Sequence, residues 1–252
     1  LKIKFINSLK YFKIKFYLTK KVFSLSFILI FTSSLSLAQI ISTDRPDQTE
    51  GTHVLLKDKF QIESGYLITD SDNYLNTLLR YGVLNKIELR INSNLITGLV
   101  NNERSTAFGN LELGLKFNIF NNINSSTKVS FLSHVSLPNK REFSNQDPIS
   151  LNRILLSHDL TESFQIGYNL GYNIGFNNHI NNFIYTLVFS KSIQKLGIFV
   201  EVFGEESSGV SKSYWDAGVI YPFSDTLQAD FSFSRGINNN SNYINFGISL
   251  NI

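Results

Sequence analysis

His134 and Ser136 are the two residues of this sequence whose types and spacing could perform catalysis. In an extended strand alternate residues point to the same side, so the imidazole and the hydroxyl would share one face. A histidine placed there could take the proton of a nucleophilic serine. Catalysis also needs a third group that orients the histidine, and Pro138 ends the segment before one follows. We therefore expect no catalytic residues and keep this pair as an alternative.

Charged residues in three neighbouring segments form a second candidate site. Segments 73–83, 86–97 and 107–120 carry charges of both signs. If these segments pair as strands, cross-strand spacing brings opposite charges together. Such residues either line a water-filled path or close it as an ion-paired latch, and pairs that only stabilise the interior are the alternative. The candidates are Arg80, Glu88, Arg90, Glu112 and Lys116, with His134 on a following segment.

The segment Thr43–Gly51 carries a regular charge pattern of its own. Asp44, Asp47 and Glu50 are spaced by three, and Arg45 lies among them. Buried charges need partners, so we expect a leader of residues 39–58, which contains this TDRPDQTE motif, to fold against the charges of the candidate strands. A mobile leader is the alternative. Hard cations need six or more placed oxygens, so we predict no metal site here, and no cofactor.

The elements that must position these residues are β-strands, and the segment 164–175 has the clearest pattern. Its large apolar residues alternate with Gln, Gly and Asn. A period of two places successive side chains on opposite sides of a strand. The pattern recurs along most of the chain, in segments close to the roughly 9–11 residues that cross an outer membrane at a tilt. We expect the apolar faces to meet lipid and the polar faces to line an interior.

Twelve segments have this character, although in 183–192 the lipid-facing side cannot be assigned from the sequence. A soluble β-sandwich or a periplasmic barrel is the alternative, but such strands average nearer five or six residues. The sequence therefore predicts an all-β fold over 59–252, a transmembrane antiparallel up-and-down β-barrel of about twelve strands. The predicted strands are 59–69, 73–83, 86–97, 107–120, 126–138, 149–159, 163–175, 183–192, 196–205, 213–222, 226–236 and 243–252.

Residues 1–38 have the pattern of a secretory signal peptide. A lysine-rich stretch precedes an apolar run over 22–37, and Ser36-Leu37-Ala38 resembles a cleavage site. The run is shorter than the roughly 20 apolar residues of a spanning helix, which is the alternative. Seven of the 23 basic residues and none of the 20 acidic ones lie in 1–38, so the remainder carries 16 basic and 20 acidic residues. We therefore predict no nucleic-acid partner. Cysteine is absent from the sequence, which excludes disulfides and thiolate metal sites.

The predicted connections alternate between short and long, as in outer-membrane barrels. Leu84-Asn85, 160–162 and 222–225 are short and turn-like, whereas 98–106, 139–148 and 206–211 are longer polar stretches. The final strand runs to Ile252. Outer-membrane barrels present such a last strand to the barrel-assembly machinery, although the signal usually ends in an aromatic residue.

The segment Thr43–Gly51 resembles the leader of a family of bacterial outer-membrane proteins that are labelled transporters or linked to the meta pathway of phenol degradation. Similar segments follow in the same order. They are Phe60–Gly65, Leu79–Gly82 with Ile87–Arg90, and Phe108–Leu111 with Gly114–Lys116. Asn110 stands where the family commonly has aspartate. The resemblance implies a monomeric type of barrel that passes small, often apolar, molecules.

From these patterns we expect a bacterial outer-membrane channel or passive transporter for small solutes, apolar or aromatic ones included. Its expected partners are outer-membrane lipid, the solute and the barrel-assembly machinery. Two alternatives stay open: a lipid hydrolase that uses His134 and Ser136, and a structural or adhesive barrel without transport.

Overall fold

A computed structural model describes residues 41–122, 124–144, 147–176 and 181–252 of the chain. The predicted signal peptide, 1–38, lies outside the described residues. Among the residues that are described, no helix has the length and apolar character needed to cross a membrane.

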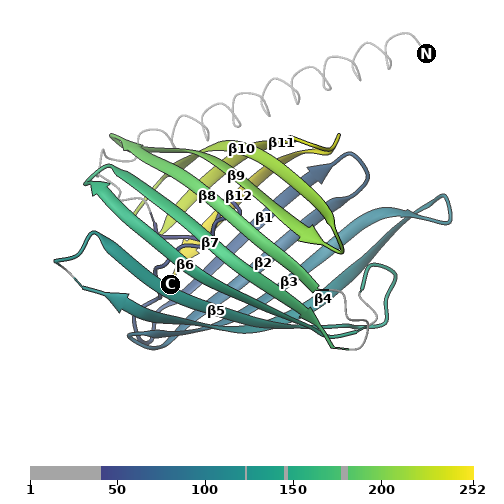
Figure 1. Cartoon of the computed structure of the whole chain (residues 1–252), viewed down its shortest axis with the longest axis horizontal. Helices are drawn as coiled ribbons and strands as arrows, with labels where there is room; N and C mark the ends of the chain where they lie inside the picture. The colour runs from purple at the N-terminus through teal and green to yellow at the C-terminus, as the bar shows by residue number, and fades with distance from the viewer. Residues whose placement is uncertain (1–40, 123, 145–146, 177–180) are drawn as a thin grey trace, which may run out of the picture. The chain divides into compact units, whose positions relative to one another are not determined.

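The described chain forms twelve consecutive β-strands in one closed sheet (Figure 1). Each strand pairs with its sequence neighbours, and β1 pairs antiparallel with β12, which closes the barrel. The prediction of an up-and-down barrel is confirmed, and strand bounds differ from the predicted ones by at most four residues. The strands are β1 (Phe60–Thr69), β2 (Asn73–Leu84), β3 (Ile87–Val100), β4 (Glu103–Asn121), β5 (Thr127–Leu137), β6 (Ile149–Thr161), β7 (Phe164–Gly175), β8 (Asn181–Ile193), β9 (Leu196–Ser207), β10 (Val210–Pro222), β11 (Leu227–Gly236) and β12 (Asn242–Asn251).

The alternation along β7 sorts its side chains as the sequence predicts. Leu170 and Tyr172 on the outer face are each 48% exposed, whereas Asn169 on the inner face is fully buried. Large apolar residues on the outside of a closed barrel match a hydrocarbon environment, and polar residues inside match a lumen. The glycines of β7 lie on the inner face, where they leave room for the interior contents.

The structure decides the faces of β8, which the sequence left open. Phe183, Leu187 and Phe189 point outward, and Thr186 and Val188 are buried inside the barrel. The inner face of this strand is partly apolar because it contacts other buried groups rather than water. One of these is Thr49, whose hydroxyl lies 2.7 Å from that of Thr186.

Two predicted long connections are wrong. Residues 98–106 and 206–211 are mostly strand, and the links are the pairs Asn101-Asn102 and Ser208-Gly209. All four linking residues have positive φ, between 50° and 79°, as two-residue hairpin turns require. The ends of these strands resemble loops in their polar composition, because a hairpin that extends beyond a membrane needs no apolar face.

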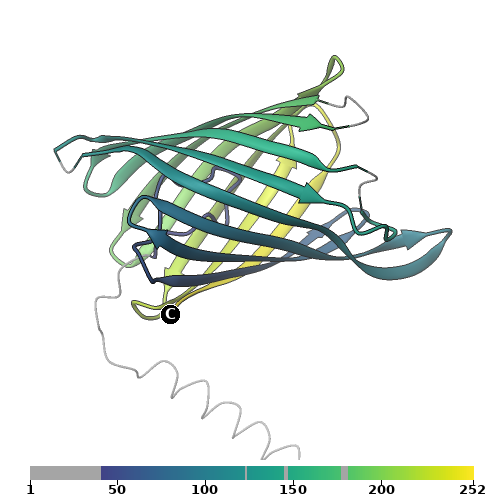
Figure 2. The ribbon, with the colours of Figure 1, turned by 90° about the horizontal axis from the view of Figure 1, so that it is seen from below.

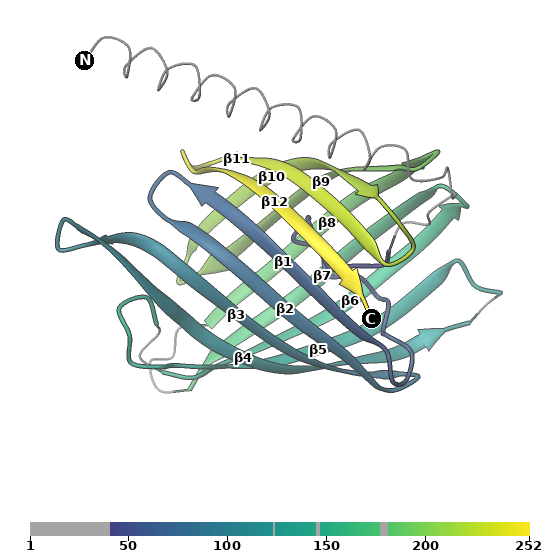
Figure 3. The same ribbon diagram turned by 180° about the vertical axis from the view of Figure 1, so that it is seen from behind.

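The two ends of the barrel differ in their connections. One end, here called the turn end, carries the links Asn85-Lys86, Glu162-Ser163 and Gln194-Lys195, together with Ile252. The other, the loop end, carries the two-residue turns 101–102 and 208–209 together with 70–72, 237–241 and the longer link 138–148. Figure 3 shows β1 and β12 side by side, with the chain terminus at the turn end.

The leader, here residues 41–58, enters the barrel and lies inside its wall (Figure 2). Most of its wall partners occupy the turn-end halves or the middles of the strands, from Gln61 in β1 to Gln228 in β11, and Tyr243 near the loop end of β12 is an exception. The leader therefore occupies the turn-end part of the lumen.

Candidate functional site

The leader backbone is held by polar side chains of the barrel wall. The amide of Ile41 donates to Gln228 Oε1 at 2.9 Å, that of Gln48 to Glu201 Oε2 at 2.7 Å, and that of Glu50 to Asn169 Oδ1 at 2.7 Å. Buried backbone groups need such partners, because a loop taken out of water otherwise loses its hydrogen bonds. The inward polar residues of β7, β9 and β11 thus serve as anchors for this segment.

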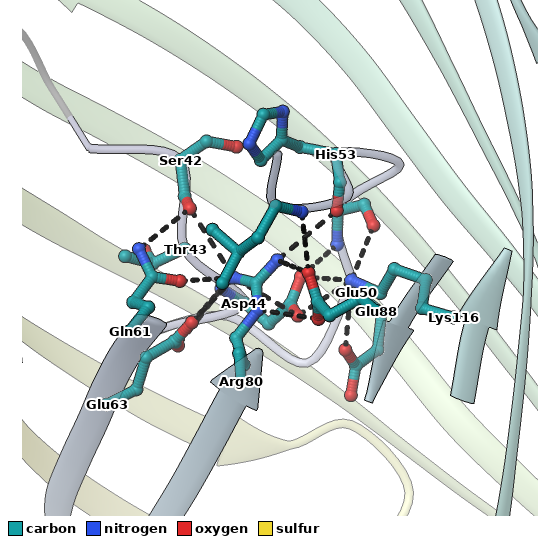
Figure 4. Close-up of polar contacts among 12 residues, drawn as sticks. Ser42, Thr43, Asp44, Glu50, His53, Gln61, Glu63, Arg80, Glu88 and Lys116 are labelled. Carbon is teal, nitrogen blue, oxygen red and sulfur yellow. Dashed lines mark hydrogen bonds and ion pairs between the residues drawn. The ribbon is translucent and has the colours of Figure 1, made fainter. Parts of the chain in front are cut away.

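Asp44 lies at the centre of a cluster of three basic side chains from β2, β3 and β4 (Figure 4). Lys116 Nζ donates to its two carboxylate oxygens at 2.9 and 2.7 Å, and Arg90 Nη1 donates to Oδ2. Arg80 Nη1 is 3.6 Å from Oδ2. Burial alone would raise the pKa of Asp44, but the three positive charges outweigh it and hold that pKa well below its usual value. Asp44 is therefore a buried anion that joins three strands.

The register of the sheet explains why this carboxylate is needed. Arg80 of β2 is directly opposite Arg90 of β3. Like charges in that position repel each other, so the pair requires an anion between them. Neighbouring acids complete the balance: Arg80 donates to Glu88 at 2.8 and 2.9 Å and to Glu63 at 2.7 Å. Arg90 Nη2 donates to Glu50 Oε2 at 2.9 Å.

Arg45 occupies a slot at the seam where the barrel closes. Its guanidinium bonds Asp230 Oδ1 and Asn245 Oδ1, each at 3.0 Å. Gly65 of β1 and Gly247 of β12 are opposite each other below it. A Cβ atom would come within 1.9 Å of Arg45 at Gly65 and within 2.2 Å at Gly247, so the two glycines create the space for this side chain.

Asp47, also in the leader, lies near another part of the wall, where two acids are buried. The amide of Gln48, the next residue, bonds Glu201 of β9, which is directly opposite Asp216 of β10. Burial, followed by these neighbouring charges, raises the pKa of Asp47 well above its usual value.

Of the residues proposed from the sequence, six meet in the cluster around Asp44, and the others lie apart from it. Glu112 instead accepts from Asn92 at 2.9 Å and lies 3.4 Å from His134 Nδ1. The residues in the Asp44 cluster are Asp44, Glu50, Arg80, Glu88, Arg90 and Lys116. Glu63, Glu201, Asp216 and Asp230 also contribute to these clusters, although the sequence patterns did not single them out as site residues. Their one available signal is that each is a charge on the polar face of an alternating segment.

His134 and Ser136 share the inner face of β5, but they make separate contacts. Ser136 Oγ accepts from Asn110 Nδ2 at 2.8 Å. His134 Nδ1 is directed at Glu112, and its Nε2 has no hydrogen-bond partner among the described residues. Their hydroxyl and imidazole are thus not joined by any hydrogen bond in the described part of the chain, as a nucleophile and its base would be.

Two neighbouring cavities lie on the loop-end side of the leader. The first has a volume of about 360 Å³, a floor formed by leader residues and a wall rich in amides. The second has a volume of about 420 Å³ and a more apolar wall. Gln48 and Arg153 line both. The wall of the first includes Asn76, Asn92, Asn94, Glu112 and His134, and that of the second includes Ile184, Thr186, Phe203, Tyr214 and Tyr243.

Within the described ranges, no group of three or more His, Asp or Glu side chains is arranged to hold a metal ion. This holds also for Asp47 and the two acids near it.

Solved structures with the same fold are outer-membrane porins and channels. The COG4313 outer-membrane channel from Pseudomonas putida F1 matches with a TM-score of 0.60 and 11% identity, over 84% of this chain and 100% of that one. The NanC porin matches with a TM-score of 0.58 and 11% identity, over 76% of this chain and 98% of that one. The KdgM porin in complex with disordered oligogalacturonate matches with a TM-score of 0.58 and 9% identity, over 75% and 98%. At these identities the similarity establishes the fold alone.

A search of curated proteins finds no match. A family model does match, over residues 43–252, so the match begins at the leader motif and includes every strand of the barrel. It covers most of the chain. The chain therefore belongs to the family described as "MetA-pathway of phenol degradation".

Proposed function

We propose that this protein is a passive channel for small solutes in the bacterial outer membrane, with the loop end outside the cell. In this proposal the leader is a plug that narrows the turn-end half of the lumen. The two cavities above it are the vestibule that a solute enters first. A barrel of twelve strands is wider than packed eight-stranded barrels and narrower than open porins of sixteen, so a plug of this size restricts it strongly.

The observation that carries the proposal is the polar lumen with solvent space above the leader. The vestibule has about 360 and 420 Å³ in its two parts, which is the size of ordinary small-molecule sites. A barrel that served only as a structural support would fill its lumen with packed side chains instead. The fold shared with porins and channels agrees with passage through the lumen.

We assign the latch to Asp44 and its three basic partners. Passage beyond the vestibule requires the leader to shift, and the Asp44 cluster is the most heavily charged contact that holds it. The remaining leader contacts are mostly single hydrogen bonds, which are individually weaker than an anion shared by three cations.

Solute flux into proteoliposomes tests this function. We expect sugars and small polar aromatics to enter at rates that fall with size, and Asp44→Asn to raise these rates because it weakens the latch. The matched control is Asp58→Asn, an identical change in the same segment at a side chain that is 70% exposed. Heat-modifiable gel mobility verifies that each variant is folded. Absence of flux in both the wild type and Asp44→Asn would overturn the channel.

The proposal includes no catalysis. The separate hydrogen bonds of His134 and Ser136 and their position inside the lumen, away from lipid, support this. Lipid hydrolysis by the purified protein that disappears in Ser136→Ala would reverse the assignment.

A further inference from the structure

The acids of the lumen are ion-paired on one side and lack ion pairs on the other. Around β2, β3 and β4, the acids pair with Arg80, Arg90 and Lys116. On the β9–β10 side, Glu201 is directly opposite Asp216, and the amide of Gln48, the residue after Asp47, bonds Glu201 at 2.7 Å. None of the ion pairs formed by the described residues includes any of these three acids. Buried carboxylates without a positive partner are costly, so this wall is incomplete as it stands.

One carboxylate oxygen of Asp216 shows directly that this wall lacks a positive partner. Its side chain is fully buried, and Oδ2 accepts from the Tyr243 hydroxyl at 2.9 Å. The other oxygen, Oδ1, is buried and has no hydrogen-bond partner among the described residues. Glu201 could donate to it only when protonated, and both oxygens of Glu201 already accept from the leader at Gln48 and Thr49. A positive charge nearby would offset the repulsion between these carboxylates and would give Asp216 Oδ1 a partner.

An aromatic surface adjoins the acids on the vestibule side. The rings of Phe203 and Tyr214 stack with centroids 5.1 Å apart, and Tyr243 lies 6.5 Å from Phe203. All three rings line the second cavity, which also contains the acids Asp70 and Glu205 on its wall. Arg153 is the basic residue of that wall among the described residues, and it lies 3.8 Å from Glu50. Aromatic faces next to carboxylates attract organic cations, because the ring quadrupole and the acids act in the same direction.

The leader connects the acids to this surface. Gln48 lines both cavities, and its side-chain amide donates to the Tyr243 hydroxyl at 3.4 Å. Asp47, next to it, lines the first cavity. A ligand can therefore reach Asp47 with one end while the other end lies against the rings.

We propose that this wall is a binding site for small organic ammonium ions with an apolar or aromatic body. The cationic head lies against Asp47, in the field of Glu201 and Asp216. The body lies against Phe203, Tyr214 and Tyr243. The inference rests on the proposed channel function, for which it names a preferred class of solute.

Calorimetric titration of the purified protein in a nonionic detergent tests the site with three ring-matched probes: phenyltrimethylammonium, benzyl alcohol and benzenesulfonate. We expect the cation to bind about tenfold or more tightly than the alcohol, and the anion most weakly, since tenfold corresponds to one well-placed charge interaction. Asp216→Asn should lower the affinity for the cation about tenfold and leave that for the alcohol unchanged. Phe203→Leu should weaken the binding of the cation while the carboxylates remain. Asp58→Asn is the control.

Equal binding of the cation and the alcohol would overturn the inference, and so would a cation affinity that Asp216→Asn and Phe203→Leu both leave unchanged. The acids would then hold protons rather than a ligand. Failure here is separate from failure of the channel. A barrel that passes sugars without an ammonium preference contradicts only this site, and a sealed barrel that binds ammonium contradicts only the channel.

Discussion

The guanidinium of Arg45 occupies the space that a side chain at Gly247 would need. A Cβ atom on Gly247 would lie 2.2 Å from Arg45 Nη2. Gly247 is in the last strand and Arg45 is in the leader, so the seam that closes the barrel is shaped around a residue from before the first strand. Closure of the sheet and placement of the leader are therefore coupled at this point.

Gly247→Ala should destabilise the barrel by about 1–3 kcal/mol, the usual cost of overpacking, because the new methyl group displaces Arg45 from Asp230. The temperature at which the compact band is lost on gels measures this. Ser249→Ala, on the same inner face of β12, is the control, since the Ser249 hydroxyl is buried without a hydrogen-bond partner among the described residues. The double variant Gly247→Ala/Arg45→Ala should be destabilised by less than the sum of the destabilisations of the two single variants. Strict additivity would contradict the coupling.

Asp44→Asn should lower the free energy of unfolding by about 3–5 kcal/mol at neutral pH, since it removes the buried anion that three basic side chains share. Urea unfolding in detergent, followed by tryptophan fluorescence, measures the change. Asp58→Asn should stay within about 0.5 kcal/mol of the wild type because that side chain is mostly exposed. Similar losses in both variants would contradict a special role for Asp44.

The two leader aspartates should affect stability with opposite dependence on pH. The pKa of Asp44 is lowered from 3.8 on folding, so its contribution is complete above that pH and is lost only in stronger acid. The pKa of Asp47 is raised from 3.8, so its contribution is complete below that pH and is lost as the pH rises through the folded value. Asp47→Asn should match the wild type near pH 3 and exceed its stability at higher pH. Unfolding midpoints across pH measure both, and parallel profiles for the two variants would contradict the assignment.

Single introduced cysteines should distinguish the water-filled vestibule from the lipid-facing surface by their rates of labelling. No native thiol competes for the reagent, because the chain has no cysteine of its own. Asn94 lines the first cavity and Leu187 lies on the outer face of β8. In proteoliposomes a charged, water-soluble maleimide should label Asn94→Cys at least about tenfold faster than Leu187→Cys, because thiolates form only where water reaches. Equal rates would show that β8 or the vestibule is misassigned.

The alternation of residues was enough to predict the strands, since it is a local property that every short segment carries on its own. The alternation correctly predicted the outward face of β7 and a barrel of twelve strands. The same reasoning failed at Asn101-Asn102 and Ser208-Gly209, where polar strand ends look like loops. It also left β8 undecided, because an apolar inner face and a lipid-exposed outer face have similar compositions.

The leader was recognisable from its charges, and the segments that contain Arg80, Glu88, Arg90 and Lys116 from their alternation. Which charges meet was not recognisable. Asp44 reaches three strands only because the sheet register places Arg80 opposite Arg90 and places Lys116 opposite Glu88, two residues from Arg90. The leader next to Asp47 meets Glu201, which is 153 residues from Gln48 in the chain.

The sequence by itself determined that the chain is a barrel with an apolar outside and a polar inside, because side-chain direction in a strand depends only on neighbouring residues. Tertiary structure alone decided where the leader lies, that Gly65 and Gly247 face each other beneath Arg45, and that the acids of one wall have basic partners while those of the other have none among the described residues. These are contacts across a closed sheet. They depend on its register and on the path of a segment inside it, neither of which any local pattern contains.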